Sequence, residues 1–211
     1  MTDFREPTGG VGGIADTCAF YRSLFIPVAV IADLDIITDL KRLMVTLETL
    51  TSDPGTLAKA RAEAVAVLDA LRKLNPQIAP QDLQTALHDI ATQPMEWGAG
   101  HDHAVRKSLN SLAARLDRLR RLKHGGIDAL PVPLPTLFSA LTSTLAESGL
   151  FLVPVGELEG WLADKGLKSS RGRKWAWANE AAEMLRKLPP EPKDIWGFIR
   201  GISSYLRAAL G

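Results

Sequence analysis

The hydrophobic pattern of the chain predicts two buried β-strands among many helices. Residues 27–35 read PVAVIADLD, a run of β-branched and aliphatic residues that breaks off in two carboxylates. A short apolar run rich in Val and Ile, followed by a helical pattern, is typical of a strand in a parallel sheet that is covered on both faces. A second such run, LFLVPV at residues 150–155, is followed by Gly156, Glu157, Leu158 and Glu159.

Apolar residues at a period of 3.6 predict helices over most of the remaining chain. Asp53 and Pro54 form a typical helix start, an N-cap followed by proline in the first turn. Four consecutive helices between residues 36 and 123 amount to a helical insertion between the two strands, so the fold class is a helix-rich α/β domain. We expect helices at residues 14–25, 36–50, 55–74, 80–91, 94–123, 135–148, 157–164, 175–187 and 193–209.

Composition narrows the class of protein. The chain has 211 residues, 46% of them hydrophobic and 23% charged, which is ordinary for a globular domain. Its net charge of +1 gives no global sign of nucleic-acid binding, so any basic surface must be local. The single cysteine, Cys18, excludes an internal disulfide and fits a reducing compartment. With no apolar window of membrane-spanning length and no signal peptide, we expect a cytoplasmic protein without a membrane partner.

The acidic strand ends are the first candidate for chemistry. Side chains two apart on a strand share a face, so Asp33 and Asp35 are expected to project together from the carboxyl end of their strand. Ligands bind at that edge in open α/β sheets, and paired carboxylates suit a hard cation such as Mg²⁺. The alternatives are capping of a strand-to-helix turn by the two aspartates, and favourable charge at a helix N-terminus for Glu157 and Glu159.

Basic residues supply the second half of a possible phosphoryl-transfer site. The loop KSSRGRK at residues 168–174 follows the second strand, and a lysine beside a carboxylate-held metal offsets charge in the transition state. The helix at 94–123 carries a leucine stripe and many Lys and Arg residues. It either contacts a phosphate backbone or forms a solvated arm, and its leucine stripe is a surface for self-association.

Other patterns are weaker. The run from Asp33 to Thr38 resembles the start of haloacid dehalogenase-type phosphatases, but Ile37 stands where that motif has a small residue or Thr. The glycines at 9–13 predict a flexible turn, because no Gly-Lys-Ser/Thr follows. His101 and His103 are two apart on a helix and point different ways, so we expect an exposed pair. We expect Cys18 to be a small buried residue, and core or interface positions for Trp161, Trp175, Trp177 and Trp196.

Several motifs together resemble the Toprim domain of the OLD (overcoming lysogenization defect) family nucleases. They are the strand ending at Asp33 and Asp35, the later GLFLVPVGELE, and Lys174-Trp175. The glycine-rich turn, the helix at 14–25, the KHGG of residues 123–126 and the helical insertion are also similar to that family's C-terminal region. The resemblance covers about residues 9–209. It implies a Toprim-like parallel sheet flanked by helices, with Toprim-like parts at residues 1–50 and 131–211 and a helical insertion at 51–130.

The resemblance also implies a function. It indicates a Mg²⁺- or Mn²⁺-dependent DNA endonuclease that hydrolyses phosphodiesters with two metals. Asp33 and Asp35 would be metal ligands, and Glu157 and Glu159 would support the metals and catalysis. Lys174 would be the transition-state lysine, with Arg173 as a substitute. DNA binding would fall to Arg171, Arg173, Arg118, Arg121 and Lys123.

One part of the Toprim pattern is missing. Such domains open with a strand ending in a glutamate that acts as general base or metal ligand, and Glu6 has no apolar strand before it. The ATPase domain that precedes Toprim in the family is missing as well. We expect a piece of a larger protein, a chain that pairs with an upstream ATPase domain, a partner or itself, or a chain that has lost activity. The alternative function is a non-catalytic DNA- or protein-binding domain, and a third is a monomeric phosphatase.

Overall fold

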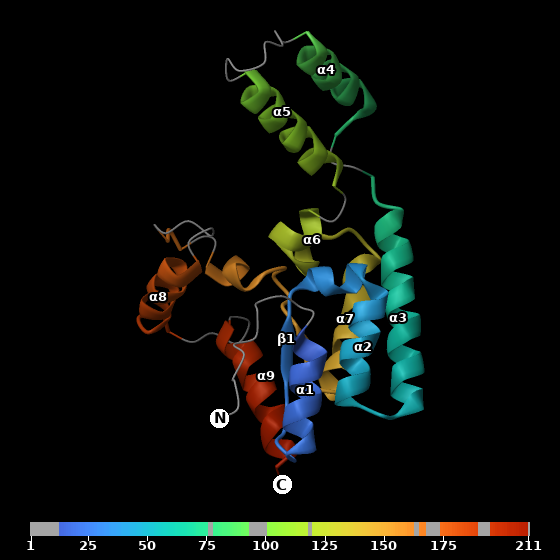
Figure 1. The fold of residues 1–211 in the computed structure, drawn as a ribbon, viewed down its shortest axis with the longest axis vertical. Helices are drawn as coiled ribbons and strands as arrows, with labels where there is room; N and C mark the ends of the chain where they lie inside the picture. The colour runs from blue at the N-terminus through green and yellow to red at the C-terminus, as the bar shows by residue number, and fades with distance from the viewer. Residues whose placement is uncertain are drawn as a thin grey trace, which may run out of the picture.

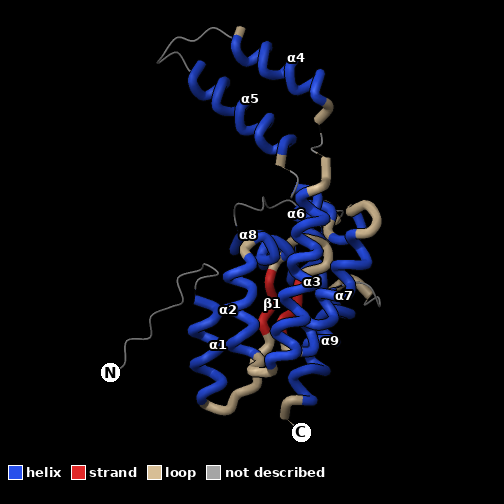
Figure 2. The backbone as a smooth tube through the Cα atoms, turned by 90° about the vertical axis from the view of Figure 1, so that its right-hand side faces the viewer, coloured by secondary structure: helices blue, strands red, loops and turns tan. Residues whose placement is uncertain are grey.

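A two-stranded parallel sheet lies among the helices of the main body (Figures 1 and 2). Strand β1 (Val30–Ala32) pairs with β2 (Leu150–Leu152), with Val30 opposite Leu150. The computed structural model describes residues 13–75, 78–92, 101–117, 120–162, 165–167, 174–189 and 195–210, without the side chains of His101, Arg120, Arg121, His124 and Lys174. The helix-rich α/β class predicted from the sequence is confirmed for these residues, while the Toprim-like topology and the three domain boundaries stay predictions.

Helices make up most of the described chain. Three short 3₁₀ segments accompany the strands and their loops: η2 (Leu34–Thr38), η3 (Ile127–Ala129) and η4 (Leu158–Leu162). The α-helices are α1 (Ile14–Ser23), α2 (Leu40–Leu50), α3 (Pro54–Arg72), α4 (Pro80–Ala91), α5 (His101–Leu116), α6 (Arg120–Gly125), α7 (Leu134–Glu147), α8 (Lys174–Leu185) and α9 (Ile195–Ala208).

Aspartate caps begin the two helices that follow β1. The Asp39 carboxylate accepts the N–H of Arg42 at 3.0 Å at the start of α2. Asp53 does the same for Thr56 at 2.8 Å at the start of α3, where Pro54 occupies the first turn. Each cap satisfies a backbone donor that the first helical turn leaves without a partner. The helix start predicted at Asp53-Pro54 is confirmed.

One face of the sheet carries the main hydrophobic core. Val30, Leu150 and Leu152 point toward apolar side chains of α2, α3 and α7. Helices α3 and α7 pack against each other, and Phe138 of α7 is completely buried between the layers. The small residues Ala60 and Ala64 of α3, both fully buried, belong to the same core and permit close helix packing.

The opposite face of the sheet is covered over β2 and open over β1. Phe151 of β2 makes edge contacts with Phe198 and Tyr205 of α9, at ring-centroid distances of 6.2 and 5.8 Å. Ile31 of β1, on the same face, is 45% exposed to solvent. The prediction that both faces are covered is therefore confirmed over β2 and wrong over β1 within the described residues. Exposed apolar side chains also lead into β1, namely Phe20, Tyr21, Leu24, Phe25 and Ile26.

Helices α4 and α5 pack against each other and project from the main body as an arm (Figures 1 and 2). The single helix predicted over 94–123 is wrong, because α5 ends at Leu116 and α6 begins at Arg120. The break divides the leucine stripe. Leu112 is buried on α5, whereas Leu122 of α6 belongs to the main core. Leu109 remains 46% exposed, so part of the stripe is open to solvent as predicted.

Both strands are shorter than predicted. β1 ends at Ala32, and Asp35 lies in η2 together with Ile36 and Ile37, which were predicted to open the next α-helix. β2 ends at Leu152, because the chain turns at Pro154 and reaches a positive φ of 96° at Gly156. Within the segment predicted as an α-helix over 157–164, Leu158–Leu162 form the 3₁₀ segment η4, and residues 163–164 lie outside the described residues.

Two remaining expectations concern Cys18 and membranes. Cys18 is 3% exposed, as predicted, and burial raises the pKa of its thiol against the opposing effects of the Thr49 hydrogen bond and the charge of Arg22. Among the described residues, no helix has the length and apolarity needed to cross a bilayer. The glycine-rich stretch at residues 9–12 lies outside the described residues.

Replacing Phe138 by Ala should lower the free energy of unfolding by about 3–5 kcal/mol, because the side chain is fully buried and its removal leaves a cavity. Urea unfolding measures the loss. The matched control is Phe25→Ala, whose side chain is 96% exposed and whose replacement should change stability by less than about 0.5 kcal/mol. Equal losses of unfolding free energy in the two variants would show that Phe138 of α7 is not buried against the sheet.

Candidate functional site

The parallel register brings the acidic ends of both strands to one place. The N–H of Val30 donates to Gly149 at 2.8 Å, and the N–H of Val153 donates to Ala32 at 2.9 Å. Beyond the strands, the N–H of Leu34 still donates to the carbonyl of Gly156 at 3.1 Å. Since the ladder continues past both strand ends, the turns that carry Asp33 and Glu157 begin side by side.

Asp33 shows that the two turns share one electrostatic environment. Partial burial raises the pKa of its carboxyl first, and the negative charges of Asp35 and Glu159 raise it further. The positive charge of Lys123 and a hydrogen bond from the backbone N–H of Leu158 oppose this rise. The site therefore combines carboxylates from both strand ends, as the sequence predicted, with a lysine from a third segment.

Asp33 does not serve as a helix cap. It stands at the N-cap position of η2 with extended backbone angles, φ −67° and ψ 156°, but its side chain makes no capping hydrogen bond to that segment. Asp39 and Asp53, by contrast, both accept such bonds. The capping interpretation of Asp33 is wrong, and its carboxylate instead accepts the N–H of Leu158 in the opposite turn.

Glu157 and Glu159 occupy different positions in the second turn. The Glu157 carboxylate lies 3.0 Å from the Lys123 ammonium, and its side chain is 14% exposed. Its carbonyl accepts the N–H of Gly160 at 2.8 Å, which fixes the turn. Glu159 lies in the first turn of η4, where negative charge is favourable. Glu157 thus forms an ion pair, while Glu159 adds its charge to the environment of Asp33.

Two glycines hold α6 against the end of β2 and so position Lys123. Gly126 and Gly156 have φ values of 65° and 96°, which L-residues with side chains rarely adopt. A Cβ atom on Gly156 would collide with the carbonyl of Lys123, and one on Gly126 would collide with the carbonyl of Pro154. The N–H of Ile127 donates to that same Pro154 carbonyl at 2.9 Å. Close backbone contact therefore places the lysine beside the acidic turn.

Lys123 is the residue of this site whose ion pair the sequence did not predict. Its ammonium pairs with Glu157 and acts on Asp33, and its DNA-binding role stays a prediction. The signal in the sequence was the glycine pair of residues 125–126, two residues further along the chain, which indicates a close backbone approach but not the segment that is approached.

The donor types at this site fit a hard divalent cation. Burial raises the pKa of Asp33, and the negative charges of Asp35 and Glu159 raise it further, while Glu157 pairs with Lys123. Within the described part of the chain, no three His, Cys, Asp or Glu side chains converge closely enough to bind one metal together. Mg²⁺ typically uses one or two carboxylates and keeps several waters. Asp33 and Asp35, with Glu159 nearby, could hold the ion in that way.

Several predicted site residues cannot be placed beside this cluster. Lys174 is the first residue of α8, but its side chain lies outside the described residues. The same holds for the side chain of Arg121 in α6, and Arg118, Arg171 and Arg173 are outside the description altogether. Their catalytic and DNA-binding roles stay predictions. His103 on α5 is exposed as expected, while the side chain of His101 is among those not described.

Comparisons of this chain with protein-family models, curated proteins and solved structures yield no match.

Replacing Asp33 by Asn should raise the free energy of unfolding at neutral pH in metal-free buffer. The folded-state pKa of Asp33 lies above its ordinary value of 3.8, so the native state disfavours the charged carboxylate. The interval between the ordinary pKa of 3.8, which applies to the unfolded chain, and the raised pKa of the folded state is the range that matters. Within it the native state binds more protons than the unfolded chain, so the free energy of unfolding of the wild type falls as pH rises. The gain in stability of the Asn variant over the wild type should be largest at pH values above the folded-state pKa of Asp33 and should vanish below pH 3.8.

Urea unfolding at a series of pH values measures this difference. Asp53→Ala is the control of opposite sign, because hydrogen bonds from Thr56 lower the pKa of Asp53, and removing that carboxylate should destabilise the protein at neutral pH. If the Asp33→Asn variant were less stable than the wild type at neutral pH, the ionised Asp33 carboxylate would not be unfavourable in the folded state.

Substituting Ala for Gly156 should destabilise the protein by about 2 kcal/mol or more, since a left-handed conformation alone costs an L-residue roughly 1–2 kcal/mol and the collision with Lys123 adds to it. Gly201 of α9 is the control, because an added Cβ there meets nothing within 4 Å. Gly201→Ala should gain up to about 1 kcal/mol from higher helix propensity. Thermal unfolding compares them, and equal tolerance of both substitutions would argue against the close approach of α6 and β2.

Proposed function

We propose that this chain is the catalytic domain of a metal-dependent DNA endonuclease that hydrolyses phosphodiesters, of the Toprim type found in OLD-family nucleases. The observation that carries the proposal is the shared environment of Asp33, where carboxylates from the ends of two parallel strands act on one another. Perturbed carboxylates at the carboxyl edge of a parallel sheet are typical of a ligand site. The resemblance of both strand motifs to the Toprim domain supports the same function.

Each residue has a distinct role in this proposal. Asp33 and Asp35 bind Mg²⁺ or Mn²⁺, and Glu159 adds negative charge beside them. The bound metal supplies Lewis-acid activation of the phosphate and of the attacking water. Lys123 neutralises Glu157, which reduces the repulsion that an incoming phosphate meets. Lys174 stabilises the transition state, as the family resemblance implies.

DNA reaches the site through basic surface on the arm and on α6. Arg106, Lys107 and Arg115 of α5 are exposed, and Lys123 of α6 remains 51% exposed although it pairs with Glu157. Exposed cations attract the phosphate backbone without reading its sequence. The net charge of the chain is only +1, so this attraction is local. Salt screens exposed charges, so the attraction should fall as salt is added.

The second candidate function is a non-catalytic module that binds DNA or a partner chain. Two observations favour it: Lys123 already pairs with Glu157, and no three potential metal ligands converge among the described residues. In that case the acidic cluster is a structural ion-pair network, and the exposed face of the arm makes the contacts. An upstream strand bearing a glutamate in the full-length protein would favour the nuclease.

Supercoiled plasmid incubated with the protein and Mg²⁺ or Mn²⁺ distinguishes the two functions. We expect metal-dependent nicking that disappears in the double variant Asp33→Ala/Asp35→Ala. The charge-matched control is Asp82→Ala/Asp89→Ala, which removes two exposed carboxylates from α4 and should leave nicking unchanged. DNA binding without any nicking under either metal, or nicking that survives in the Asp33/Asp35 variant, would overturn the catalytic proposal.

A further inference from the structure

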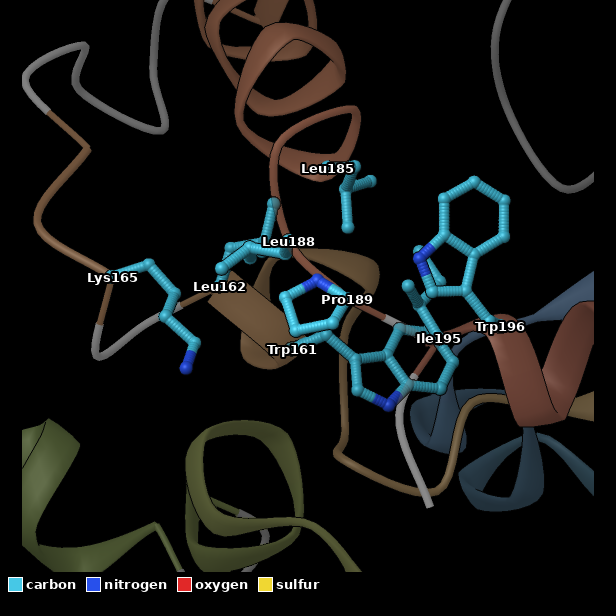
Figure 3. A pocket seen from close by; sticks show the side chains of 8 residues that line it. All are labelled: Trp161, Leu162, Lys165, Leu185, Leu188, Pro189, Ile195 and Trp196. Atoms are coloured by element: carbon cyan, nitrogen blue, oxygen red, sulfur yellow. The ribbon is translucent and has the colours of Figure 1, made fainter. Parts of the chain in front are cut away.

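A pocket lies directly downstream of the acidic turn, between η4, the end of α8 and the start of α9 (Figure 3). Its walls include Trp161 and Trp196 together with Leu185, Leu188 and Pro189, and Lys165 stands at its rim. About 100 Å³ of open space lies inside. A single water needs only about 10–15 Å³ measured in this way, so the pocket has room for a larger group.

Trp161 links the pocket to the carboxylate cluster through the backbone. It lies on η4 two residues after Glu159, so the two Cα atoms are at most about 7.6 Å apart. Its indole ring contacts Phe198 of α9 at a centroid distance of 5.0 Å and an angle of 48°. This contact orients the indole, and η4 thus carries both Glu159 of the acidic turn and Trp161 of the pocket wall.

The chemistry of the walls selects a flat, apolar group that is attached to an anion. Two indole rings line the pocket, the leucines and the proline make its walls apolar, and the exposed Lys165 supplies a positive charge at the edge. Stacking of bases on aromatic side chains next to a backbone-binding cation is the common mode of single-stranded nucleic-acid recognition. An apolar side chain of a protein partner would use the same walls but would not need the lysine.

We propose that this pocket binds one unpaired nucleobase of the DNA strand whose phosphodiester lies at the carboxylate cluster. The inference rests on the proposed endonuclease function and makes it more specific, because the favoured substrate is then DNA with single-stranded character at the cleavage point. Trp161 and Trp196 were expected to be core or interface residues, and the pocket gives these two half-buried side chains a binding role.

Equilibrium binding in EDTA tests the pocket without requiring cleavage. Fluorescence anisotropy compares a labelled oligothymidylate with an abasic deoxyribose-phosphate chain of the same length. The wild-type protein should bind the oligothymidylate more tightly. Trp161→Leu and Trp196→Leu should each weaken that binding roughly 5- to 100-fold and leave the abasic chain unaffected, since one stacked base is lost. Lys165→Gln should weaken both ligands and reduce the salt dependence.

Trp175→Leu is the matched control. Trp175 is 83% exposed on α8 and does not line the pocket, so its replacement should change neither affinity. Circular dichroism verifies that each variant is folded, and Trp196→Leu and Lys165→Gln keep the test decisive if Trp161→Leu does not fold.

Equal wild-type affinity for the two ligands would overturn the pocket proposal, and so would unchanged base-dependent binding in folded tryptophan variants. Loss of self-association alone in the tryptophan variants would also overturn it, because it would assign the pocket to a protein contact. Failure of the nuclease function gives a different result, in which base-dependent binding persists in EDTA but plasmid is never nicked with metal.

Discussion

The parallel pairing of β1 and β2 is the constraint on which the rest of the molecule depends. Only three residues of each strand pair, yet the ladder extends to the bond from Leu34 to Gly156 and so brings two distant acidic turns together. A register shift of one residue would exchange the faces of every strand side chain. The core under Val30 and Leu150 prevents such a shift, and the close contact at Gly156 fixes α6 and Lys123 to the same edge.

Crowding of carboxylates at that edge opposes folding. The pKa of Asp33 is raised by burial and by its acidic neighbours, and one lysine offsets only part of the repulsion. Sites that serve binding or catalysis often keep such unfavourable arrangements at the expense of stability. A divalent cation would remove the repulsion, which gives the metal-binding interpretation a physical basis that does not depend on resemblance.

Features set by local sequence, such as helix starts and apolar periodicity, were predicted correctly. Features set by packing between distant segments were missed. Caps and apolar periodicity located α3 at Asp53-Pro54 and α7 within a residue of its observed bounds. The break between α5 and α6 was missed because the leucine stripe continues through it, although Leu112 and Leu122 pack in different places. The carboxylates were predicted from their strand-end positions. The ion pair of Lys123 with Glu157 was not, since only the fold brings α6 beside the end of β2.

Divalent-cation binding is the property that separates a metal site from a structural ion-pair network. Isothermal titration of metal-free protein with Mn²⁺, with Mg²⁺ as competitor, should show saturable binding that both ions share and that Asp33→Ala/Asp35→Ala abolishes. Binding that persists unchanged in that variant, or no binding by the folded wild-type protein, would contradict a metal site built from the ends of the two strands.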